Sequence, residues 1–188
     1  VWSNHSLWLR TIAISANAIF FWGWLGWLPT YMRSARHFTL STSGYLTFVI
    51  YGFAVVTILI LGYVSDRVFR RAPFAGLGWA LAAVFLIAAA LAPSATWSVV
   101  LMICALCAQQ VGISGAEMLM HSVVGTADMA KSQGVRAFVT QMFGAFSPIM
   151  IGYLLAFSHG AFIVPFAVLA FAVVVAAGCM IALAREGL

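Results

Sequence analysis

The stretch Gly62–Arg71 reads Gly-Tyr-Val-Ser-Asp-Arg-Val-Phe-Arg-Arg and is the densest charge cluster of the chain. The segments on either side of it, 43–61 and 72–91, contain no charged residue. A charged island between two apolar segments indicates a short connection at a membrane surface. Its charged residues are Asp66, Arg67, Arg70 and Arg71.

The composition favours a membrane protein. Of the 188 residues, 64% are hydrophobic and only 7% are charged, whereas soluble domains carry about 25% charged residues. A soluble fold of this length has too little interior to bury so much apolar surface. We therefore interpret the net charge of +5 as a property of membrane topology, and we expect the lipid bilayer, not nucleic acid, as a partner.

Six apolar segments punctuate the chain, and each is close to the 17–25 residues that cross a bilayer as a helix. The predicted fold is all-α: a polytopic membrane protein whose residues 1–188 form a single bundle of six transmembrane helices. The expected helices are 11–31, 43–64, 74–91, 97–120, 135–157 and 161–184.

Lysine and arginine set the predicted orientation, because cytoplasmic loops are enriched in them. With the N-terminus inside, only Arg33 and Arg36 fall outside the cell. We therefore expect a multi-pass protein of the inner (plasma) membrane with both termini in the cytoplasm. The residues then assigned to the cytoplasm are Arg10, Arg67, Arg70, Arg71, Lys131, Arg136 and Arg185.

Polar residues are distributed unevenly among the segments. The segments 74–91 and 161–184 contain no charge, asparagine or glutamine. Polar groups in hydrocarbon are costly unless they face protein or water. We expect these two segments to face lipid and the segments 11–31, 97–120 and 135–157 to line an interior, as a three-plus-three repeat requires.

A polar stripe runs along the segment 97–120. Gln110, Ser114, Glu117 and His121 follow at steps of four, three and four, which places them on one helical face. With Gln109 they are predicted to form a hydrophilic wall of a transport pathway, with Glu117 as a proton or ion site. The alternative for Glu117 is an interfacial carboxylate among lipid headgroups.

Two other segments add candidates for the pathway. Asn17 and Trp24 lie deep in 11–31, where they can bond to and stack on a substrate, although packing explains Trp24 equally well. Trp27 and Tyr31 lie nearer the outer surface and are interpreted as an aromatic belt. Gln141 begins a face that helix packing also explains. The predicted substrate pathway comprises Asn17, Trp24, Gln109, Gln110, Ser114, Glu117 and Gln141.

Asp66 is the residue of the island that topology does not explain. An acid is unfavourable at the C-terminal end of a helix. It requires a partner, either a nearby arginine or the N–H groups at the start of another helix. We predict that this contact acts as a latch on the cytoplasmic face.

No metal, cofactor or catalytic group is expected. Cys104 and Cys107 share a C-x-x-C spacing, but no second Cys or His pair completes a metal set. Cys179 also lies in an apolar run, so all three cysteines are interpreted as packing residues.

The charged island resembles the G-x-x-x-D-R-x-G-R-R motif of the major facilitator superfamily, with Phe69 where that motif has glycine. The stretch Gly26–Met32 looks like the seventh helix of members of the anion:cation symporter type. The resemblance covers all six segments in order and spacing. The matching residues, which form a cytoplasmic gating motif in the family, are Gly62, Asp66, Arg67, Arg70 and Arg71.

The resemblance implies that the chain is the C-terminal six-helix half of a twelve-helix transporter. It implies alternating-access transport of a small solute, an organic anion, by proton symport or exchange, and no enzymatic activity. The expected partners are that solute and the missing N-terminal half or a second copy. Asp66 is then expected to meet the start of the fifth helix, near Arg136.

Two alternatives stay open at this point. Gly112-Ile-Ser114-Gly115 matches the G-x-S-G motif of rhomboid-type intramembrane serine proteases. A nucleophilic serine needs a base within hydrogen-bond reach, and the segment 161–184 contains no histidine. The other alternative is a membrane fragment that transports nothing.

Overall fold

The structure is a computed structural model and describes residues 5–65, 71–119 and 129–185. The described residues form six α-helices and no strand, and every helix is long and apolar enough to cross a membrane. The predicted all-α fold with six transmembrane helices is confirmed. The helices are α1 (His5–Ser34), α2 (Leu40–Ser65), α3 (Arg71–Leu91), α4 (Ala95–Met118), α6 (Met129–Phe157) and α7 (Ile163–Arg185).

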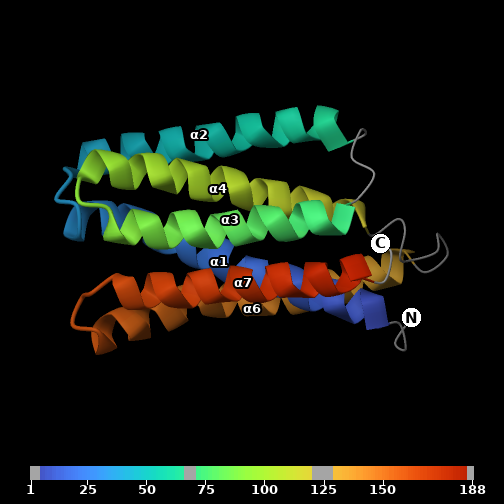
Figure 1. Cartoon of the computed structure of the whole chain (residues 1–188). Helices are drawn as coiled ribbons and strands as arrows, with labels where there is room; N and C mark the ends of the chain where they lie inside the picture. Colours follow the sequence, from blue (N-terminus) through green and yellow to red (C-terminus); the bar gives the residue numbers. More distant parts are fainter. Residues whose placement is uncertain (1–4, 66–70, 120–128, 186–188) are drawn as a thin grey trace.

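Successive helices run antiparallel, so α1 begins and α7 ends at the same end of the bundle, here called the terminal end (Figure 1). The opposite end, the hairpin end, holds the connections 35–39, 92–94 and 158–162. These connections are short, and local hydrogen bonds help to end one helix and begin the next. Ser94, for example, caps α4 by accepting a hydrogen bond from the backbone N–H of Trp97.

The helices associate as two units of three (Figure 1). In one unit α4 packs on α2 and α3, and in the other α1 packs on α6 and α7. The contact between α3 and α7 joins the units, whereas α1 and α4 touch at few positions. Exchanging α1 with α4, α2 with α6 and α3 with α7 preserves this pattern of neighbours, as expected of a three-plus-three repeat.

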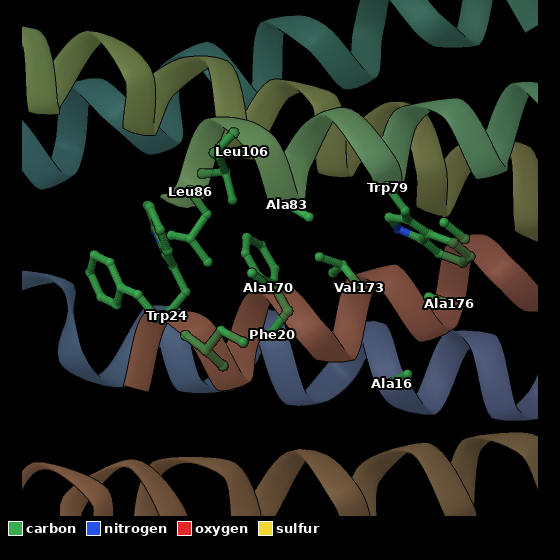
Figure 2. Packing of buried hydrophobic residues seen from close by; sticks show 14 of the residues in the cluster. Ala16, Phe20, Trp24, Trp79, Ala83, Leu86, Leu106, Ala170, Val173 and Ala176 are labelled. Carbon is green, nitrogen blue, oxygen red and sulfur yellow. The ribbon is translucent and has the colours of Figure 1, made fainter. Parts of the chain in front are cut away.

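The core lies where the two units meet (Figure 2). Trp24 of α1 stacks between Phe20 and Phe166, with ring centroids 5.6 and 6.0 Å away. Leu86 and Leu106 close the same layer from α3 and α4. Because lipid tails are as apolar as these side chains, close packing and not the hydrophobic effect holds them together.

Glycines allow α3 and α4 to approach closely. A Cβ on Gly78 would lie 2.6 Å from the backbone nitrogen of Gly112. Gly112 in turn leaves room for the indole of Trp79, and Gly115 for Ala75. The glycines of the sequence Gly112-Ile-Ser-Gly115 are therefore explained by helix packing, and the structure gives them no further role.

A second set of close contacts joins α6 to α1. Gly144 receives the indole ring of Trp22, and Gly152 faces Trp27. The Nε1–H of Trp27 donates to the carbonyl oxygen of Pro148 at 2.9 Å. Trp27 therefore packs between α1 and α6, a contact that its interpretation as part of an aromatic belt did not include.

The outer faces differ between the helices. Within 72–91 of α3 and in α7, the exposed side chains are all apolar apart from Arg185, which suits the predicted lipid-facing positions. The inner faces of these helices pack against each other in the core. α2 and α6 are the most exposed of the six, each with 17% of its central span buried, so their apolar faces have few partners within the described residues.

Candidate functional site

Glu117 lies in the last turn of α4 at the terminal end and binds two arginines from other helices. One carboxylate oxygen accepts from Nη2 of Arg10 on α1, and the other accepts from Nη1 of Arg136 on α6, both at 2.9 Å. A single carboxylate therefore joins three helices. Charge-assisted bonds of this length are among the stronger ones in proteins.

Arg10 is the buried member of this terminal cluster, which we define as Arg10, Glu117 and Arg136. Its side chain has 0% exposure, whereas that of Glu117 is 40% exposed. Its Nε also donates to the backbone carbonyl of Ala116 at 2.8 Å. Those contacts bridge α1 and α4 where the two helices otherwise barely touch.

The sequence singled out Glu117 but not its partners. Arg10 was assigned only to cytoplasmic topology, and Arg136 was also placed near the expected contact of Asp66, because no sequence pattern relates α1 to α6 or α4. The sequence left two interpretations of Glu117, a carboxylate at the headgroup interface and a pathway site. The structure adds a third, an ionic bridge between helices. Gln133 supports Arg136 by accepting from its Nε at 2.7 Å.

At the middle of the bundle, an amide pair joins α1 to α4. Nε2 of Gln109 donates to Oδ1 of Asn17 at 2.9 Å, and both side chains are buried. The second amide atom of Gln109, Oε1, has no hydrogen-bond partner in the structure. Buried acceptors are rarely left unpaired, so this atom is suited to bind water or a polar solute.

The other predicted pathway residues are dispersed. Gln110 is buried, Ser114 is half-buried, and Gln141 is exposed on α6. Trp24 packs in the core, yet its Nε1–H also has no partner. The structure therefore brings Asn17 together with Gln109, and their membership of a substrate pathway stays a prediction for all seven residues.

The hairpin end holds a polar network that sequence reasoning missed. Tyr31 is 2% exposed, so its interpretation as part of an interfacial belt is wrong. Its hydroxyl lies 3.0 Å from Oγ of Ser98, which itself donates to the carbonyl of Ala89 at 2.9 Å. Nε of Arg36 donates to the same tyrosine hydroxyl at 2.7 Å.

Arg36 also caps the C-terminus of α3. Its Nη1 donates to the carbonyl oxygen of Ala92 at 2.9 Å and its Nη2 to that of Ala89 at 2.8 Å. Arginine is favourable here because the last carbonyls of a helix lack partners and carry partial negative charge. The three polar bridges between the units, at the terminal end, the middle and the hairpin end, all involve α1.

We expect Arg36→Met to lower the free energy of unfolding by about 1–3 kcal/mol, because several carbonyl oxygens lose a charged donor. The measurement is the unfolding midpoint of the purified chain in mild detergent. Arg33→Met is the matched control, since Arg33 is exposed and has neither a side-chain hydrogen bond nor an ion pair among the described residues. Equal midpoints for the two variants would contradict the capping role.

Part of the charged motif cannot be placed. Asp66, Arg67 and Arg70 lie outside the described residues, as does His121. Gly62 and Arg71 lie near the end of α2 and at the start of α3. The predicted contact between Asp66 and the start of the fifth helix therefore stays a prediction.

Comparison with known proteins identifies a distant relative. No family model matches the chain. The chain is similar to the probable L-galactonate transporter of Escherichia coli (strain K12), with 26% identity over 165 residues that cover 83% of this chain and 36% of that protein. The chain thus spans about a third of the length of this relative.

The homologue is named as a transporter and not as an enzyme, which speaks against the protease alternative. This homology extends over 165 residues, a much longer stretch than the charged motif, and it agrees with the resemblance of that motif to transporters. The chain is a homologue of a major-facilitator-type transporter, and its six apolar helices fit half of that fold.

Proposed function

We propose that the chain is a six-helix half of a secondary active transporter that moves a small organic anion by alternating access across the inner membrane. The observation that carries the proposal is the homology to a transporter named for L-galactonate, which is itself the anion of a sugar acid. In this proposal both termini lie in the cytoplasm, and a second half, or a second copy, completes the pathway.

The internal geometry supports a mechanism in which α1 and α4 separate. Their apolar contact is small, and polar bridges connect them instead. Such bridges can break and re-form without creating voids in a packed core. The terminal cluster closes the cytoplasmic end in one state, and its rupture accompanies opening toward the cytoplasm.

Two of the buried polar atoms that lack a hydrogen-bond partner among the described residues support a solute site. Oε1 of Gln109 accepts hydrogen bonds and Nε1 of Trp24 donates them. A sugar acid offers hydroxyl groups that can do both. We propose that Asn17, Gln109 and Gln110 contact these hydroxyls, and that Trp24 supports the site by packing.

Glu117 is the candidate for proton coupling in this half. As a carboxylate it accepts from both arginines. Once protonated, one oxygen becomes a donor and is no longer suited to accept from an arginine. Binding of a proton therefore loosens one of the two bridges, which links protonation to movement of α1 or α6 relative to α4.

Uptake of labelled L-galactonate tests the proposal, measured with the protein as the cell makes it and reconstituted in vesicles. We expect uptake that an inward proton gradient stimulates and that Asp66→Asn impairs without loss of membrane insertion. Gradient-independent exchange against internal galactonate would identify an exchanger. Uptake equal to that of protein-free vesicles would contradict the function for this solute class.

A further inference from the structure

The hairpin end of the bundle carries positive charge only. The acidic residues of the chain are at positions 66, 117, 128 and 186, and none of these positions falls in the hairpin-end connections or in the adjoining helix turns. Arg33 and Arg36 are the charged residues of this end. An anion that approaches it therefore meets attraction without a competing carboxylate from this chain.

The two arginines play different roles. Arg36 directs its donors to Tyr31 and to the carbonyl oxygens at the end of α3. Arg33 lies in the last turn of α1, three residues after Thr30, and is exposed. Among the described residues it has neither an ion pair nor a side-chain hydrogen bond, so all five donors of its guanidinium are available.

Arg33 borders a pocket of about 450 Å³ between the end of α1 and the start of α2. This volume falls in the range of sites that hold small molecules. Hydroxyl-bearing residues line it together with Arg33, and two apolar residues complete the lining. The lining residues are Thr30, Arg33, Ser34, Phe38, Thr39 and Leu40.

The polar groups of the pocket fit an oxyanion and not a cation. A guanidinium matches the planar carboxylate group and phosphate oxygens with two parallel donors. Oγ1 of Thr39 is fixed by Oγ1 and the backbone N–H of Thr42, and Oγ of Ser34 donates to the carbonyl of Thr30. These local bonds hold the hydroxyl-bearing turns on both sides of Arg33 in place.

We propose that this pocket is an oxyanion-binding site at the hairpin end, with Arg33 as its charged partner. The ligand group is a carboxylate or a phosphate. If the ligand is the carboxylate of a solute, the site rests on the proposed function and binds the transported anion first, at the outer mouth. If the ligand is the phosphate of a lipid headgroup, the site does not depend on transport.

The test uses the full chain in nanodiscs of zwitterionic phosphatidylcholine, titrated by calorimetry with sodium L-galactonate and with inorganic phosphate. We expect Arg33→Gln to weaken binding about tenfold, the size expected for one lost charge-assisted contact. Arg185→Gln removes the same charge from the exposed end of α7 and is expected to leave the affinity unchanged. Arg33→Lys is expected to bind more tightly than Arg33→Gln but more weakly than the unchanged chain, because lysine keeps the positive charge without the two parallel donors of the guanidinium.

A second arm identifies the source of the oxyanion. Native mass spectrometry of the same variants counts phosphatidylglycerol molecules retained from mixed nanodiscs. Retention that depends on Arg33, without binding of the soluble anions, supports the site as a headgroup site. Anion binding and lipid retention that are both insensitive to Arg33→Gln would overturn the proposal.

Binding is read without turnover, so the outcomes separate the site from the transport function. Arg33-dependent anion binding combined with absent galactonate uptake would contradict the proposed function and leave the site standing. Uptake that occurs normally in Arg33→Gln at low solute concentration, together with unchanged binding, would overturn the site and leave the function standing.

Discussion

Glu117→Gln is expected to lower the free energy of unfolding by about 3 kcal/mol. The substitution leaves the guanidinium of Arg10, which has 0% exposure, without its carboxylate partner. Removing one member of a buried ion pair costs about 3–5 kcal/mol, because the remaining charge stays desolvated. The lower end of that range applies here, since solvent reaches 40% of the Glu117 side chain and screens the interaction.

The measurement is equilibrium unfolding of the purified chain in mild detergent. Arg136→Gln is the matched single variant, and we expect it to cost clearly less, because Arg136 is partly exposed and its Nε bond to Gln133 lies within one helix. The double variant Arg10→Met/Glu117→Leu is expected to regain most of the stability, since it removes the fully buried charge of Arg10 together with its partner, and the remaining charge of Arg136 is partly exposed.

Two outcomes would contradict the bridging role. If Glu117→Gln unfolds like the unchanged chain, Glu117 is an interfacial carboxylate, as one interpretation of the sequence held. If the double variant is no more stable than Glu117→Gln alone, the loss does not arise from the stranded charge of Arg10. The bridge between α1 and α4 would then need another explanation.

The helices were predictable from the sequence because a helix must contain about 20 mostly apolar residues to cross a bilayer, and the chain has six apolar runs close to that length. Their ends were less predictable. α1 begins at His5 and not near residue 11, and α6 begins at Met129 and not near residue 135. Both extensions mix polar and apolar residues, and a helix can continue beyond the hydrocarbon, so helix ends are harder to predict than the spans themselves. These extensions carry Arg10 and position Arg136.

The rotation of each helix was harder to predict than its existence. The stripe with Gln110 and Glu117 was assigned to one face, yet Gln109 is the residue that bonds Asn17. Adjacent helical residues point about 100° apart, and a segment that is apolar on most sides gives weak guidance about its inner face. The contact of Arg10 with Glu117 was unpredictable for another reason: the two residues lie on helices far apart in the sequence.

Gly78→Val is expected to be the most damaging single substitution in the helix-packing core. A Cβ at this position would lie 2.6 Å from the nitrogen of Gly112 and 2.9 Å from the carbonyl oxygen of Ala108. Both atoms belong to the α4 backbone, so no side-chain rotation relieves the clash, and α3 must move away from α4. Overpacking commonly costs about 1–3 kcal/mol and occasionally more, and we expect the upper end.

Gly178→Val is the matched control for this prediction, because Gly178 is exposed on α7 and no atom lies within 4 Å of its Cβ position. Its free energy of unfolding is expected to stay within about 0.5 kcal/mol of that of the unchanged chain. Both variants exchange the same residues in transmembrane helices, so the difference in helix propensity contributes alike. A loss of equal size in the two would show that valine disfavours these helices generally. A loss of stability confined to Gly78→Val shows that the close contact between α3 and α4 is responsible. The unit that these two helices form with α2 depends on that contact.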